Sequence, residues 1–310
     1  MEKIGYVSAL ALILAACSAG EDAPGNDAGE MSADSGTMAE VETDGAAGSG
    51  MPEDAVASST DLASVISHER RDENRARDDW RHPQETLSFF GVEPDMTVVE
   101  VLPGNGGWYS QILMPLTAEQ GRLIGVTYPD RLWSQMFPSW SEENYERFGA
   151  DISQMSRYMS VDGVVSAQPI VGYTIDDIPD AENGSADMVL FIRALHHLFR
   201  FEEPMIDTAL AEVFDILAPG GVVGVVQHRA PESADAEFAS GNNGYLKQSD
   251  VIAAFERAGF VLEDVSEVNA NPNDPADGFV WRLPPTTTNN EATLAIGESD
   301  RMTLRFRKPE

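Results

Sequence analysis

Short apolar runs alternate with amphipathic stretches along the chain from about residue 61 to its end. Apolar stretches at helical spacing separate most of these runs, and a helix between two strands requires parallel pairing through a right-handed crossover. The pattern therefore predicts a doubly wound α/β sheet. The last two runs are joined by the Pro-rich stretch 269–297 instead of a helix, which predicts an antiparallel hairpin at the sheet edge. We expect strands at 97–102, 122–128, within 161–173, and at 186–192, 222–227, 260–268 and 301–307.

The first strand leads into a glycine turn in the sequence TVVEVLPGNGGWY, residues 97–109. Glu100 is the one charged residue of the apolar run. Apolar residues recur at helical spacing after the turn, so the glycine loop is expected to open onto a helix N-terminus. Free backbone N–H groups and the helix dipole favour negative charge at such an end. The stretch predicts a nucleotide-type cofactor site.

The residues before this strand predict two helical segments. Leu62, Val65 and Ile66 share one helical face, and the stretch 68–81 that follows is dense in Arg, Asp and Glu. This predicts an amphipathic or salt-bridged helix, either as a solvated face or as a lid over the cofactor site. A second short helix is expected from Pro83 to Phe90, because Gly91 follows as a stop.

The formal charge of the 310-residue chain is -32, from 52 acidic and 20 basic residues. Such a charge excludes a nucleic-acid partner or an anionic membrane surface on electrostatic grounds. The hydrophobic content of 42% is sufficient for a sizeable core. We therefore expect a globular protein whose acidic surface keeps it soluble.

The N-terminus predicts a targeting segment. Lys3 precedes the apolar run Ile4–Ala16, which is too short for a membrane-spanning helix and ends in Leu-Ala-Ala-Cys. This ending resembles the bacterial lipobox, in which the cysteine, here Cys17, is lipidated. An ordinary secretory signal or a buried apolar helix with a chance cysteine is the alternative. A lipidated chain with Ser18 after the cysteine is expected in the cell envelope, on the periplasmic face of the outer membrane.

Three parts follow from these patterns. Residues 1–17 are expected to be a lipoprotein signal peptide and residues 18–60 a disordered acidic Ala/Gly/Ser tether, because the tether composition cannot bury enough apolar area to offset the entropy of ordering. Residues 61–310 are expected to form the folded domain. Contact with a membrane is expected only through the lipid anchor.

The order of four motifs resembles the class I S-adenosylmethionine-dependent methyltransferases over roughly residues 78–309. The resemblance implies a Rossmann-like methyltransferase sheet preceded by N-terminal helices, with S-adenosylmethionine as cofactor and an unidentified small-molecule methyl acceptor. The chain also resembles a bacterial group of exported predicted methyltransferases, through its Pro-Gly loop followed by aromatics, its His after the fourth strand and its Lys-Pro ending. The four motifs are EVLPGNG, SADMVLFIRALHHL, DILAPGGVVGVVQH and AAFERAGF.

The resemblance also implies site residues. The first motif would surround the amino-acid part of the cofactor, because absent glycine side chains let backbone amides approach closely. Asp176, after the third strand, would meet the adenine edge. The cofactor-binding set is Glu100, Gly104, Asn105, Gly106, Thr127, Asp176 and Arg193.

Histidines follow the fourth and fifth strands, where open α/β sheets place reactive groups. His196, His197 and His228 are the catalytic candidates, because a histidine there can act as a base toward the substrate nucleophile. Neutral histidines bonded to loop carbonyls are the structural alternative. Arg229 is expected to hold an acidic substrate group. A metal site is not expected, since no cysteine or further spaced histidine accompanies the pair.

Two residues depart from the family pattern. Leu102 stands where the first motif has its first glycine, and Thr127 ends the second strand where an acid binds both ribose hydroxyls. A threonine cannot accept two hydrogen bonds as a carboxylate does, so cofactor affinity should fall unless Tyr128 or Asp130 compensates. An NAD site fares no better, because Tyr109 occupies the place of the third fingerprint glycine.

Location adds a second conflict, because S-adenosylmethionine is made and used in the cytoplasm. Two functions of different class therefore remain. One is a methyltransferase, and the other is an envelope lipoprotein that uses the same scaffold as a non-catalytic module for a small molecule or a partner. No motif indicates the oligomeric state.

Overall fold

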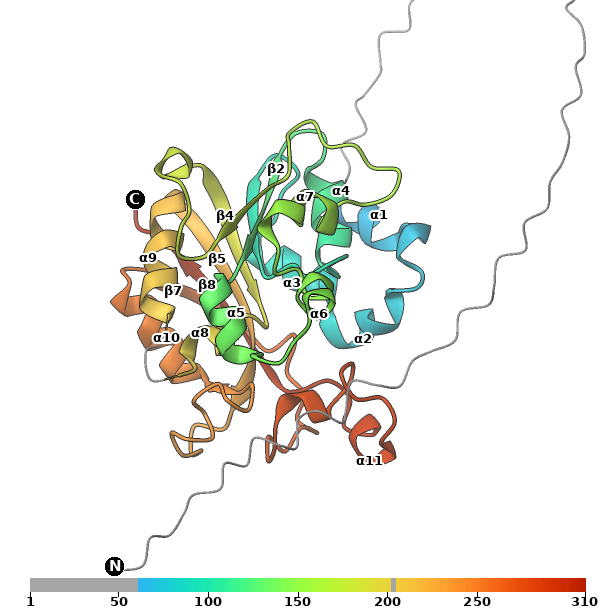
Figure 1. Ribbon diagram of the computed structural model, residues 1–310, viewed down its shortest axis with the longest axis vertical. Helices are drawn as coiled ribbons and strands as arrows, with labels where there is room; N and C mark the ends of the chain where they lie inside the picture. The colour runs from blue at the N-terminus through green and yellow to red at the C-terminus, as the bar shows by residue number, and fades with distance from the viewer. Residues whose placement is uncertain (1–60, 202–204) are drawn as a thin grey trace, which may run out of the picture. The chain divides into compact units, whose positions relative to one another are not determined.

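The computed structural model describes residues 61–201 and 205–310 (Figure 1). The predicted signal peptide and tether lie outside these ranges. The strands pair in the order β3-β2-β1-β4-β5-β8-β7, with β6 beside the end of β5. They are β1 (Thr97–Val101), β2 (Arg122–Thr127), β3 (Val171–Thr174), β4 (Ala186–Ile192), β5 (Leu217–Ala230), β6 (Leu246–Lys247), β7 (Val261–Ser266) and β8 (Arg301–Arg307).

Strands β1 to β5 are parallel to one another in this sheet, whereas β8 runs antiparallel to both β5 and β7. The antiparallel pair forms one edge, with β8 inserted between β5 and β7. This confirms the prediction of a doubly wound, Rossmann-like sheet that is mostly parallel, has an antiparallel edge hairpin and follows N-terminal helices. The carboxyl ends of the parallel strands consequently meet the amino end of β8 at one edge.

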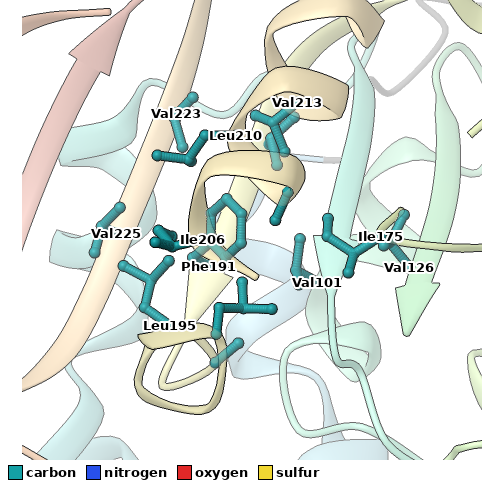
Figure 2. Close-up of a cluster of buried hydrophobic side chains, with 14 of the residues drawn as sticks. Val101, Val126, Ile175, Phe191, Leu195, Ile206, Leu210, Val213, Val223 and Val225 are labelled. Atoms are coloured by element: carbon teal, nitrogen blue, oxygen red, sulfur yellow. The ribbon is translucent and has the colours of Figure 1, made fainter. Parts of the chain in front are cut away.

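Helices cover both faces of the sheet (Figure 1). One apolar cluster joins one face to four helices, and Figure 2 shows its centre, where Val101 and Phe191 lie opposite Leu210. These helices are α5 (Asp130–Met136), α8 (Leu195–Phe199), α9 (Ile206–Ile216) and α10 (Gln248–Arg257). A second cluster joins the other face to α1 (Leu62–Ser67), α3 (Pro83–Phe90), α4 (Ser110–Thr117) and α7 (Met155–Tyr158).

Glycines let α7 approach β2 and β3 closely. Gly125 and Gly172 are partners in the register of these two strands. A Cβ atom on either would lie 2.4 Å from an atom of Met155. At Gly172 the nearest atom is the Cβ of Met155, so a side chain would require α7 to move, whereas at Gly125 it would displace the sulfur atoms of Met155 and Met159. The two glycines thus allow the close packing of the second core.

The single helix expected over residues 68–81 is wrong. The chain forms η2 (Glu69–Arg71), η3 (Arg75–Arg77) and α2 (Asp78–Arg81) instead. Arg71 donates to the carbonyl of Ile66, and Arg75 donates to the carbonyls of Ser67 and His68. Arg75 also pairs with Asp72, and Arg71 pairs with Asp78, both at 2.8 Å. The arginines therefore bond both to the end of α1 and to acids of their own stretch, and the chain forms short turns instead of one helix.

The other differences concern boundaries. The strand expected within 161–173 is limited to the four residues of β3. The stretch 132–158 divides into α5, α6 (Glu142–Arg147), η4 (Ile152–Gln154) and α7, and η5 (Asp180–Glu182) precedes β4. The excursion between β7 and β8 holds η6 (Val280–Arg282) and α11 (Glu291–Leu294). Within the described ranges, no helix combines the length and apolar character that crossing a membrane would require.

Candidate functional site

The glycine loop connects β1 to α4 with a left-handed backbone. Gly104 and Gly106 have φ angles of 73° and 69°, and Leu102 has a φ of 59°. The N–H of Leu102 donates to the carbonyl of Val126 at 2.7 Å, which fixes the residue beside the end of β2. A left-handed leucine costs about 1–2 kcal/mol. The loop therefore keeps the curvature that a glycine would give, although a side chain replaces the hydrogen.

Glu100 lies at the end of β1 with 4% of its surface exposed. The hydroxyl of Ser110, the first residue of α4, donates to Oε2 of Glu100 at 2.7 Å. Burial raises the pKa of Glu100 to about 7, and the Ser110 hydrogen bond opposes part of this rise. The carboxyl group is thus poised between its neutral and ionised forms near physiological pH.

An aromatic segment, residues 137–149, lies against the glycine loop. Gly149 approaches so closely that a Cβ atom on it would lie 2.8 Å from the Cα atom of Gly104. Phe137 and Trp140 stack with ring centroids 3.7 Å apart, and Trp140 contacts Phe148 at 4.6 Å. The aromatic residues thus pack against one another beside the loop. Asn105 is exposed at its tip.

The position expected to hold ribose is covered. Thr127 is fully buried, and its hydroxyl accepts a hydrogen bond from Nε1 of Trp133 at 3.3 Å. The Tyr128 hydroxyl donates to the carbonyl of Ala194, so this side chain does not replace the missing acid. Asp176, after β3, pairs with Arg131 at 2.8 Å. The glycine loop has the left-handed glycines that the sequence predicted for a cofactor loop, whereas the end of β2 has a buried threonine where the family pattern has a carboxylate.

The three histidines meet at the carboxyl edge, as the strand ends predicted. The ring of His196 lies 3.9 Å from that of His197 and 5.5 Å from that of His228, centroid to centroid. Burial is the main cause that lowers their pKa values, to about 3 for His196 and well below the usual value for the other two. All three rings are neutral at pH 7.

Each histidine has a side-chain partner. Nδ1 of His196 faces Oε1 of Gln227 at 3.4 Å, Nδ1 of His228 faces the Ser299 hydroxyl, and Nδ1 of His197 faces Arg200 at 3.3 Å. The structural alternative of loop-carbonyl partners is therefore not the arrangement observed at these nitrogens.

Gln227 sets the tautomer of His196. Its Nε2 donates to the carbonyl of Gly244 at 2.8 Å, which leaves Oε1 to face the histidine. Because Oε1 only accepts, Nδ1 of His196 carries the proton and Nε2 holds a lone pair. Gln227 thereby leaves the Nε2 lone pair of His196 available to accept a proton.

A group of three arginines lies at the same edge. The sequence had assigned one of them, Arg193, to the cofactor, and it had not singled out the other two. Arg81, from α2, and Arg301, the first residue of β8, flank Glu298 at N···O distances of 3.2 and 2.7 Å. Arg193 follows β4 in a left-handed conformation with a φ of 59°. The many arginines of the stretch 68–81 were the sequence signal that could have indicated this group. The contact of Arg81 with Glu298 is non-local, however, and no local pattern predicts it.

Arg229 does not serve as the expected anion-binding residue. Its guanidinium bonds to Asp300 at 2.9 Å and to Glu267 at 2.7 Å. The hydrogen bonds with these acids raise its pKa. Because two carboxylates already neutralise this arginine, the expectation is wrong. Among the described residues, no group of three or more His, Cys, Asp or Glu side chains has a metal-binding arrangement.

No protein-family model and no curated protein matches this chain. Solved structures resemble it at low identity. A SAM-dependent methyltransferase from Aquifex aeolicus has 14% identity and a TM-score of 0.44, over 80% of this chain and 98% of that one. The cyclase SpnF has 13% identity and a TM-score of 0.48, over 80% and 91%. Geranyl diphosphate C-methyltransferase from Streptomyces coelicolor, solved with Mg²⁺, geranyl diphosphate and S-adenosyl-L-homocysteine, has 14% identity and a TM-score of 0.45, over 84% and 86%.

Proposed function

We propose that this protein is an S-adenosylmethionine-dependent methyltransferase that acts on a small-molecule acceptor. The observation that carries the proposal is the left-handed glycine loop between β1 and α4, at the same sheet edge as three neutral histidines. Open α/β sheets bind ligands at this edge. The cofactor, when bound, supplies an activated methyl group, and the protein supplies binding, orientation and proton transfer.

Backbone groups of Gly104, Asn105 and Gly106 would hold the amino-acid end of the cofactor, beside the carboxyl group of Glu100. Left-handed glycines permit close approach, and the start of α4 favours a carboxylate. The N–H of Gly106 already donates to the carbonyl of Tyr158 at 2.9 Å. This bond leaves the N–H groups of Gly104 and Asn105 as the main donors to the cofactor.

The aromatic segment must move away from the loop for the cofactor to enter. The end of the segment nearest the loop favours this motion, because α6 has no buried residue and Phe148 is 46% exposed, whereas Phe137, Trp140 and Tyr145 pack against the core. Few buried contacts are the mark of a segment that opens at low cost. Since Thr127 offers ribose no carboxylate, we expect weaker cofactor binding than an acid at this position would give.

His196 is the proposed proton acceptor for the acceptor nucleophile, with Gln227 orienting it through Nδ1. Its pKa of about 3 makes it a weak base while the site is closed. A negative charge beside the ring would raise this pKa. The rings of His197 and His228 lie beside that of His196, and we propose that they orient the acceptor.

Calorimetry with S-adenosylmethionine and S-adenosylhomocysteine tests this function on the full chain, purified as the Cys17→Ala variant to avoid acylation. We expect binding that Gly104→Val abolishes, because a side chain at this left-handed position blocks the backbone approach. Gly163→Val is the matched control, since Gly163 has a φ of 75° and open space around it. Unchanged affinity in Gly104→Val would place the cofactor elsewhere.

The alternative is a binding module without catalysis. Leu102 and the Trp133–Thr127 hydrogen bond favour it, because both reduce the fit for a nucleoside. Absence of binding to either ligand at millimolar concentration would contradict the enzyme and support this second function.

We also propose that the chain is exported and anchored. Residues 1–17 would be the signal peptide, with acylation at Cys17, and residues 18–60 the tether for the domain at 61–310. The domain would work at the periplasmic face of the outer membrane, with a small-molecule partner and no nucleic acid. A methyltransferase there requires a supply of S-adenosylmethionine outside the cytoplasm.

A further inference from the structure

Arg193 stands out at the carboxyl edge because its guanidinium has no counter-ion among the described residues. Within residues 61–201 and 205–310, no side chain pairs with it, and its Nε is buried without a hydrogen-bond partner. Its backbone N–H donates to the carbonyl of Val226, which fixes the residue between the ends of β4 and β5. The backbone of Arg193 is thus fixed, while its guanidinium has no acidic partner among the described side chains.

Two further arginines lie nearby and share one acid. Arg81 is 2% exposed, and one of its Nη atoms has no hydrogen-bond partner among the described residues. The Nε of Arg301 likewise has no hydrogen-bond partner there. Both contact Glu298, which is 3% exposed. Arg301 also donates to the carbonyl of Trp80. We name Arg81, Arg193, Arg301 and Glu298 the arginine cluster.

The charges of the cluster do not balance. Counted over the described residues alone, the cluster holds three guanidiniums and one carboxylate, and that carboxylate is paired with Arg81 and Arg301 but not with Arg193. The cluster therefore has a formal excess of two positive charges. Arg81 lies over the ring of Trp108 at 4.8 Å, but a cation–π contact compensates less than the cost of removing a guanidinium from water. Folding thus retains unpaired donors at an edge that binds ligands, where a dianionic group would complete the balance.

The cluster borders the histidines, because Arg301 and His228 are register partners in the neighbouring strands β8 and β5. The charges of Arg193 and Arg301 both contribute to the lowered pKa of His228, and Arg193 also acts on His196. An anion bound to Arg193 therefore lies beside the proposed proton acceptor and would counter the effect of the arginines on its pKa.

We propose that the arginine cluster binds the anionic group of the methyl acceptor, a phosphate or a pair of carboxylates. The assignment of this anion to the acceptor rests on the proposed methyltransferase function, whereas the anion site itself does not. Planar guanidiniums bind both groups in bidentate geometry. The attraction for an anion comes from the arginine cluster alone, because the net charge of -32 repels anions from the molecule as a whole.

Thermal unfolding of the full chain without S-adenosylmethionine tests the anion site. Inorganic phosphate and malonate are the two probes, each compared with chloride at equal ionic strength. We expect at least one probe to raise the melting temperature in proportion to the logarithm of its concentration. The stronger probe distinguishes a phosphate-bearing from a carboxylate-bearing acceptor, and no shift with either would overturn the proposal.

Arg193→Gln identifies the residue. We expect it to weaken the binding of the effective probe by about tenfold or more, and to raise the melting temperature without the probe by removing an unpaired charge. Arg157→Gln is the matched control, since it makes the same charge change at a half-exposed surface pair with Glu146. Equal affinity in the two variants would contradict the proposal, and so would a lower melting temperature of Arg193→Gln without probe.

The outcome is independent of cofactor calorimetry. Probe binding that depends on Arg193 in a chain that does not bind S-adenosylmethionine would keep the anion site and reject its assignment to a methyl acceptor. Cofactor binding without any effect of the probes would keep the methyltransferase function and reject the anion site.

Discussion

Single residues carry both the agreement with the family pattern and the departures from it. The sequence predicted Glu100 at a strand end and glycines in the turn, because these features depend on local spacing. It also located the departures at Leu102 and Thr127. What it could not predict is that Leu102 keeps a left-handed backbone and that Trp133 bonds to Thr127, since both depend on tertiary contacts.

Glu100→Gln is expected to stabilise the protein at alkaline pH. The pKa of Glu100 is about 7 in the folded state, above its ordinary value of 4.5. Ionisation therefore costs folding free energy as pH rises from about 4.5 to 7, and the full cost applies above pH 7. At pH 8 we expect the variant to be more stable by about 1–3 kcal/mol, and by much less below pH 4.5.

Urea unfolding at pH 4.5 and pH 8 measures this difference, and Glu119→Gln, at an exposed position, is the control. The same Glu100→Gln variant is expected to bind S-adenosylmethionine more weakly. A stability difference that does not change with pH would show that burial does not raise the pKa of Glu100.

At the scale of elements, local patterns predicted β4, β8 and α3 with their observed bounds. The stretch 68–81 was mispredicted because Arg71 donates to a backbone carbonyl and Arg81 lies over the ring of Trp108, and no local pattern reveals either contact. The histidine site followed from strand ends, whereas the arginine cluster joins residues more than two hundred positions apart. Local spacing cannot indicate such a contact.

The pair of Arg122 and Glu182 connects β2 to the turn before β4. Arg122 donates to both carboxylate oxygens at 2.7 Å, and the hydroxyls of Tyr173 and Ser185 donate to the same group. The hydrogen bond with Arg122 is the main cause that lowers the pKa of Glu182 to about 2. Glu182 thus links β2 and β3 to the turn that precedes β4.

Glu182→Gln is therefore expected to destabilise the protein by about 1–3 kcal/mol at pH 7. A lowered folded-state pKa gives stability that is complete above about pH 5 and is lost as pH falls toward 2. The difference between variant and wild type should shrink over that range in urea unfolding. Glu146→Gln, in an exposed pair, should cost less than about 0.5 kcal/mol, and equal effects would contradict the assignment.

The whole molecule combines a strongly acidic chain with a locally cationic ligand edge. A net charge of -32 opposes binding to nucleic acids and anionic lipid surfaces, so the proposed attachment to a membrane needs a covalent anchor. One acyl chain gives marginal binding, and stable attachment requires a second signal. The proposed lipidation at Cys17 would supply this attachment without contact of the acidic domain with the membrane.

Mass spectrometry of the bacterial membrane fraction tests the anchor. We expect a mature chain that begins at Cys17 with acyl chains on this residue, and we expect Cys17→Ala to remain unacylated and to leave the membrane fraction. Because Cys17 is the one cysteine of the chain, no other thiol can substitute. Ser8→Ala, within the apolar run, is the control and should leave processing unchanged. An intact N-terminus in both the wild type and the Cys17→Ala variant would reject export, and would place the domain in the compartment where S-adenosylmethionine is made.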